Sequence, residues 1–184
     1  MWCLSGVQSV AAQRTPPDAA ELRQRGQALY EEMMRELDPD LLKRAVAKGI
    51  YRYEEYPMVR SKNPFFLRGD FNGDGTMDVA FWVTQQSSGR QGIAVIHSTL
   101  DSVYYLGAGN RAGSGMQDIG ADAWHVLPAG TTLSHVRETV PAIGAVDGRP
   151  FTFQREALQC VYLGKSSYVY YWANGRYWHI GTAD

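Results

Sequence analysis

The sequence predicts an α+β fold, in which two N-terminal helices pack on an antiparallel β-sheet of about seven strands. Three observations support this fold class. Apolar residues recur at helical spacing only before residue 50, aromatic and β-branched residues dominate the remainder, and short polar turns separate the strand-like runs. Strands joined by short turns pair antiparallel. A chain of 184 residues is long enough for one domain with a substantial core.

The helical segment is expected over residues 13–50. Asp18 and Glu21 match the pattern that caps a helix N-terminus. The apolar stripe of this first helix consists of Leu22, Leu29, Tyr30, Met33, Met34 and Leu37. Pro39 suits the first turn of a second helix, and Gly49 suits its end. The apolar face of the second helix consists of Leu41, Leu42, Ala45 and Val46. We expect both faces to pack on the sheet.

Residues 1–12 resemble the remnant of a secretory signal peptide. A modestly apolar run ends in Val10, Ala11 and Ala12, which are small residues suited to cleavage. The run is short and no basic region precedes it, so a disordered cytosolic tail is the alternative. We predict a secreted or periplasmic protein.

Residues 51–184 form the predicted β domain. Its strand-like runs are 64–67, 79–84, 92–97, 102–106, 123–127, 151–153, 158–163, 168–172 and 176–180. Asn174 and Gly175 supply the left-handed conformations that a tight hairpin turn needs. Both faces of this last hairpin carry aromatic residues. One face must be core, and the other is either a second packed layer or an exposed patch that marks a binding site.

The loop at residues 70–78 predicts a calcium site. A calcium ion needs several oxygen ligands at about 2.3–2.6 Å, and one segment supplies them by curling around the ion. Gly75 would take the sharp bend, and the carbonyl of Thr76 would be the backbone ligand. The side-chain ligands would be Asp70, Asn72, Asp74 and Asp78, the last directly or through water.

The flanks of this loop distinguish it from an EF-hand. An EF-hand carries a bidentate glutamate at position twelve and lies between helices, whereas here Phe81 occupies that position and the flanking residues favour strands.

The stretch 69–80 resembles the calcium loop of FG-GAP (VCBS-type) repeats, which form the blades of integrin α-chain propellers and occur in many secreted bacterial proteins. The resemblance implies that Asp70, Asn72, Asp74, Thr76 and Asp78 are calcium ligands. A propeller needs about four or more blades of roughly 40–50 residues, and this chain has one loop and no internal repeat. We therefore expect the hairpin and not the propeller. Together with the segment 166–177, the loop also resembles a group of small secreted bacterial proteins that are largely uncharacterised.

Composition excludes several function classes. A net charge of −1 gives no attraction to nucleic acid, and no run of 18 apolar residues could span a membrane. Cys160 lies in an apolar run and is predicted to be a buried free thiol. A Cys3–Cys160 disulfide is the alternative. The glycine-rich segment 107–115 is a loop that could form the rim of a binding surface.

The sequence contains no catalytic constellation. Its histidines are far apart and follow no metal-binding spacing, so each is expected to be a satisfied structural residue: His97, His125, His135 and His179. We therefore predict a calcium-binding, non-enzymatic binding module whose partner is a protein or a glycan. The alternatives are a calcium-dependent hydrolase, which needs two carboxylates about 5–10 Å apart, and an inhibitor or immunity protein that blocks a partner enzyme.

Overall fold

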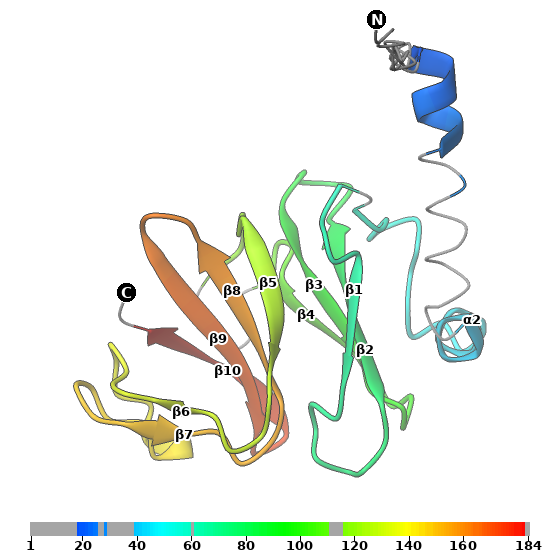
Figure 1. The fold of residues 1–184 in the computed structure, drawn as a ribbon. Coiled ribbons are helices and arrows are strands. Elements are labelled where there is room, and N and C mark those ends of the chain that lie inside the picture. Colours follow the sequence, from blue (N-terminus) through cyan, green and yellow to red (C-terminus); the bar gives the residue numbers. More distant parts are fainter. Residues whose placement is uncertain (1–17, 26–27, 29–38, 60, 111–115, 183–184) are drawn as a thin grey trace, which may run out of the picture.

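The computed structural model describes residues 18–25, 28, 39–59, 61–110 and 116–182. Its centre is a pair of antiparallel four-stranded sheets stacked face to face (Figure 1). The first sheet has the order β1 (Phe66–Gly69), β2 (Asp78–Thr84), β3 (Gln91–Ile96), β4 (Val103–Gly107). The second has the order β10 (Arg176–Thr182), β9 (Ser166–Ala173), β8 (Ala157–Tyr162), β5 (Ala123–Leu127). The α+β class and the meander of the early strands are confirmed.

The strands divide between two sheets, whereas the sequence predicted a single sheet. The reason is visible in β2, where every residue from Asp78 to Val83 is buried. A strand buried on both faces needs a layer on each side. Between the sheets, the Trp82 and Trp124 rings meet edge to face with centroids 5.5 Å apart. Fully buried side chains of both sheets, such as Ile93 and Leu158, fill the same layer.

The outer face of the first sheet is covered by helix α2 (Pro39–Ala47) and the segment that follows it. Leu41 and Ala45 are buried there, and the Tyr51 ring meets the Phe81 ring at 5.3 Å. The second predicted helix and its packing are therefore confirmed. Val46 is the exception, because its side chain is 47% exposed.

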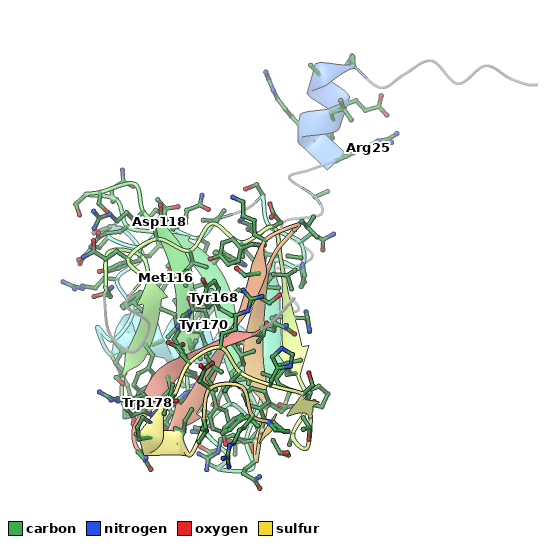
Figure 2. The ribbon with its side chains drawn as sticks, turned by 90° about the vertical axis from the view of Figure 1, so that its left-hand side faces the viewer. Arg25, Met116, Asp118, Tyr168, Tyr170 and Trp178 are labelled. Carbon is green, nitrogen blue, oxygen red and sulfur yellow. The ribbon has the colours of Figure 1, made fainter. Side chains whose placement is uncertain are left out.

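The described part of the first predicted helix forms, but it does not pack on the sheets. Residues 19–25 are helical, and the Glu21 amide donates to Asp18 Oδ1 at 2.8 Å, as the cap pattern predicted. However, Leu22 is 55% exposed, and this segment lies away from the sheets (Figures 1 and 2). The expected packing of Leu22 on the sheet is therefore wrong. The remaining stripe residues and the predicted signal remnant, 1–12, lie outside the described residues.

The outer face of the second sheet is covered by residues 127–153. This segment contains the small sheet of β6 (Thr132–Leu133) and β7 (Phe151–Thr152) and the 3-10 helix η1 (Pro141–Ile143). Phe151 and Phe153 pack there against Tyr171 of β9. Of the two alternatives for the aromatic faces of the last hairpin, the second packed layer is the one observed.

The two sheets are joined along the β1–β5 side. Trp124 Nε1 donates to the carbonyl of Pro64 at 2.7 Å, and Lys62 Nζ donates to the carbonyl of Ala121 at 2.7 Å. The opposite side is bordered by β4 and β10, the edge strands at the other end of each sheet. Within the described part of the chain, no helix is both long enough and apolar enough to cross a bilayer.

Candidate metal loop and the open side of the sandwich

The predicted metal loop is the turn of the β1–β2 hairpin. Gly69 and Asp78 are opposite each other in the antiparallel register, so residues 70–77 form the connection. The sequence prediction that two strands flank this loop is confirmed. Gly75 has a φ of 84° and Gly73 a φ of 79°, which is the conformation that a glycine adopts without strain.

Asp70 shapes the loop through its own backbone. Its Oδ1 accepts from the amides of Gly73 at 2.8 Å and Asp74 at 3.0 Å, and its Oδ2 accepts from the amide of Gly75 at 2.9 Å. A carboxylate that accepts several amides holds the chain in a tight curl. The curl that the calcium prediction requires is therefore present.

Asn72 and Asp74 lie together on the exposed part of this curl. Asn72 Nδ2 donates to Asp74 Oδ2 at 2.8 Å, and Asp74 Oδ1 accepts from the amide of Thr76 at 2.8 Å. The Thr76 hydroxyl also donates to Asp74, and this bond is the largest of the effects that lower the pKa of Asp74. The Asp74 carboxylate is thus held in its charged form, the form that a cation would bind.

Asp78 occupies a different environment, because its side chain is fully buried. Its Oδ2 accepts from the amides of Phe71 at 3.1 Å and Asn72 at 3.3 Å, and its Oδ1 accepts from the amide of Ser98 at 2.9 Å. Burial raises the pKa of Asp78 to about 6, against the opposing effect of these amides. Asp78 ties the start and end of the loop to the segment after β3.

The donor chemistry of the loop fits calcium. Among the described residues, no three acidic, histidine or cysteine side chains are grouped so that they could hold a metal ion by themselves. A site here would also need the Asn72 side-chain oxygen and the Thr76 carbonyl. All of these donors are hard oxygens, which suit calcium better than a transition metal. Calcium binding at this loop remains a prediction.

Two residues that sequence reasoning missed hold the loop from the other sheet. Glu156 Oε2 accepts from the amide of Asp70 at 2.5 Å, and an Arg155 guanidinium nitrogen donates to the carbonyl of Asn72 at 2.7 Å. Both residues directly precede β8. The fit is close, because a Cβ placed on Gly69 would lie 2.6 Å from Glu156 Oε2. Glu156 had no pattern in the sequence that pointed to this loop, which lies 86 positions earlier.

The open side of the sandwich carries a cavity of about 280 Å³ between the edge strands. Its lining is Val103, Tyr104, Tyr105, Leu106, Asn110, Arg176 and Tyr177. The Tyr104 and Tyr177 rings, one from each sheet, meet at 5.7 Å. The cavity therefore lies where the two sheets face each other at their β4 and β10 edges. Of the predicted glycine-rich loop, residues 107–110 border this region and 111–115 lie outside the described residues.

A second cavity, of about 340 Å³, lies at the ends of β9 and β10. His179 lines this cavity with 12% of its side chain exposed, and its Nδ1 lies 3.2 Å from Glu138 Oε1. Burial lowers the pKa of His179, and the neighbouring Glu138 opposes this shift. The same Glu138 oxygen accepts from the amide of Gly181 at 3.1 Å. This arrangement holds the imidazole in a fixed orientation.

His97, His135 and Cys160 fit the structural roles that the sequence indicated, and His125 is exposed on β5. His97 is buried, with its Nε2 2.9 Å from the Tyr177 hydroxyl, and burial lowers its pKa to about 4. His135 Nδ1 is 3.0 Å from Ser134 Oγ. Cys160 is a buried free thiol whose pKa burial raises to about 12. His179 is the exception, because its Nε2 is buried without a hydrogen-bond partner.

Comparison with known proteins gave no match to any family model, curated protein or solved structure.

Proposed function

We propose that this chain is a calcium-binding, non-enzymatic binding module that acts in a secreted or periplasmic setting. The observation that carries the proposal is the curled, oxygen-rich loop at 70–78, with Asp70, Asn72, Asp74, the Thr76 carbonyl and Asp78 as the proposed ligands. When bound, calcium would supply positive charge that relieves repulsion among the loop carboxylates. Millimolar calcium is available outside the cytosol, where weak loop sites can fill.

The position of the loop supports a stabilising role for the ion. Its backbone is held by Arg155 and Glu156 of the other sheet. An ion that binds only the folded loop would therefore stabilise the contact between the two sheets as well as one hairpin. The open side of the sandwich, bordered by β4 and β10, is the proposed binding face for a protein or glycan partner.

The cavities favour binding over hydrolysis. Glycoside hydrolysis requires two carboxylates across the scissile bond. The linings of the two cavities described above include a single carboxylate, that of Glu138. It is already engaged by His179 and by the Gly181 amide. These contacts suit a positioning group better than one half of a hydrolytic pair.

Thermal unfolding in excess EDTA and in 2 mM calcium tests the calcium site. At tenfold saturation the ion should add roughly 1.4 kcal/mol to the free energy of unfolding, which raises Tm by about 3–6 °C for a chain of this size. Asp74→Ala should lose this response. Asp147→Ala, which removes an exposed carboxylate far from the loop in sequence, is the matched control and should keep it. Equal Tm values with and without calcium for the parent chain would refute the site.

A further inference from the structure

The cavity on the open side of the sandwich runs along the edge of β4. Four consecutive residues of this strand line it, from Val103 to Leu106, and its volume is about 280 Å³. Successive side chains of a strand point to opposite faces of the sheet, so a cavity that touches four residues in a row follows the backbone edge of the strand. The wall of the cavity on this side is therefore made of main-chain groups as well as side chains.

The main-chain groups of Val103 and Tyr105 point away from the rest of the first sheet. Next to the last pair of the β3–β4 register, the Ala108 amide donates to the Gln91 carbonyl at 3.0 Å. Residues that exchange hydrogen bonds with the neighbouring strand alternate along an antiparallel pair, so the register directs the N–H and C=O groups of Val103 and Tyr105 outward. The carbonyl of Gly107 has the same orientation, and it accepts from an amide outside the ladder at 2.9 Å. Apart from β3, no described residue is paired with β4 at Val103 or Tyr105.

The β4 edge lacks the protection that the other strand edges have. β1 and β5 lie on the side where hydrogen bonds join the two sheets. β10 begins with the exposed Arg176, and its end is covered by the segment 136–138, where the Arg137 amide donates to the Gly181 carbonyl at 3.0 Å. Proteins usually blunt an open edge with charged residues, proline or a covering segment. β4 contains no charged residue and no proline, so its edge is suited to pairing with another strand.

Side chains of both sheets form an apolar recess beside this edge. The Tyr104 ring of β4 and the Tyr177 ring of β10 meet at 5.7 Å, and both residues line the cavity. Leu106 belongs to the same layer between the sheets. The volume of the cavity is slightly below the roughly 300–1,000 Å³ of small-molecule pockets, so it suits one large apolar side chain better than a whole small molecule. A strand placed on the β4 edge would point every second side chain toward this layer.

We propose that an extended peptide segment of a partner protein adds to β4 as a fifth strand of the first sheet and places a leucine or aromatic side chain in the cavity. Its main chain would exchange hydrogen bonds with Val103 and Tyr105, and these bonds would supply affinity, whereas the side chain in the cavity would supply specificity. A second copy of this chain fits less well, because its own Tyr104 ring is already packed against the His97 and Trp172 rings at 4.7 Å. The inference rests on the proposed binding-module function and deepens it, because it selects a protein over a glycan.

The test is a calorimetric titration of the full calcium-loaded chain with a library of blocked heptapeptides that carry leucine, phenylalanine or tyrosine at the central position. We expect at least one peptide to bind and to slow hydrogen exchange at the Val103 and Tyr105 amides. Alanine at its central position, or N-methylation of one of its two alternate sets of amides, should weaken binding at least tenfold. Val103→Pro should weaken binding about threefold to tenfold, because proline removes an outward amide but is tolerated at the first residue of an edge strand. Val103→Thr keeps the amide and should bind as the parent does.

Three results would overturn the proposal. One is that no peptide binds to a chain whose Tm still responds to calcium, which would leave the proposed calcium site standing; if short β-linked glucose oligomers bind in place of peptides, the partner is a glycan. Another is peptide binding that Val103→Pro and both alternate sets of N-methyl groups leave unchanged. The third is a dimer, detected by sedimentation, that Val103→Pro dissociates, because a second copy would then occupy the edge. Peptide binding with the expected losses, to a chain whose Tm does not respond to calcium, would support the edge site and refute the metal site alone.

Discussion

The loop at 70–78 and the cavity at the ends of β9 and β10 differ in how their polar groups are hydrogen-bonded. The loop is exposed from Gly73 to Met77, yet the side chains of Asp70 and Asp74 are engaged by nearby amides. The cavity is partly enclosed, yet it leaves His179 Nε2 without a partner. The loop carboxylates are hydrogen-bonded within their own turn, whereas the cavity borders a buried ring nitrogen that has no partner. We therefore expect the fold to depend on the internal hydrogen bonds of the loop more than on the polar groups of the cavity.

The largest effect that this comparison predicts comes from Asp78→Ala. The change removes the acceptor of three buried or half-buried amides, those of Phe71, Asn72 and Ser98. Leaving such donors unsatisfied costs about 1–3 kcal/mol each, so the free energy of unfolding should fall by about 3 kcal/mol or more. Urea denaturation in EDTA measures this loss without any contribution from calcium.

Asp147→Ala is the control for that measurement, because it removes an exposed carboxylate and should change stability by less than about 0.5 kcal/mol. A parent-like midpoint for the Asp78 variant would mean that the loop does not depend on its internal hydrogen bonds. The structural half of the comparison would then be wrong.

Gly69→Ala should have the next largest effect. The new Cβ would lie 2.6 Å from Glu156 Oε2 and 2.7 Å from the Phe71 ring, and overpacking of this kind costs about 1–3 kcal/mol. Gly120→Ala is the matched control, because a Cβ there meets nothing within 4 Å. Differential scanning calorimetry of the two variants should show a lower Tm for the first alone. Similar Tm values would show that the loop can move away from the second sheet at little cost.

Local patterns predicted the loop, and long-range packing explains what they missed. The bend at Gly75 and the cap at Asp18 depend on residues a few positions apart, so their spacing was sufficient. The docking of Glu156 on the loop depends on how the second sheet stacks on the first, which no local pattern encodes. The apolar run at 79–84 predicted a strand, but not the second sheet that buries its other face. His179 was expected to be satisfied, because a sequence cannot show which polar atoms lack a partner.

A smaller effect on the free energy of unfolding depends on pH and comes from the protonation of His179. Burial lowers the pKa of His179 below its ordinary value of 6.5, so the unfolded chain binds this proton more readily than the folded one. The stability that depends on the neutral ring is therefore present above pH 6.5 and is lost as pH falls below it. The slope for one proton is at most about 1.4 kcal/mol per pH unit. His179→Gln should flatten the profile of unfolding free energy between pH 7 and 5, measured in urea.

His135→Gln removes a histidine whose side chain is exposed and should leave that profile as in the parent chain. A His179 variant with an unchanged slope would mean that Glu138 offsets the burial of the ring. The folded and unfolded chains would then bind this proton equally well, and the ring would be charged only below its ordinary pKa of 6.5.

Glu156→Gln should have the smallest effect of these substitutions, a modest loss of calcium affinity. Glutamine keeps a side-chain oxygen for the Asp70 amide but removes one negative charge beside the loop. Removing a negative charge near an ion in a solvated setting costs roughly 0.5–1 kcal/mol of binding free energy, so calcium affinity should fall about threefold while stability in EDTA changes little. Glu54→Gln, an exposed carboxylate distant from the loop in sequence, is the control in the same calorimetric titration. If the Glu156 variant instead loses stability in EDTA and keeps its calcium affinity, Glu156 serves only to dock the loop on the second sheet.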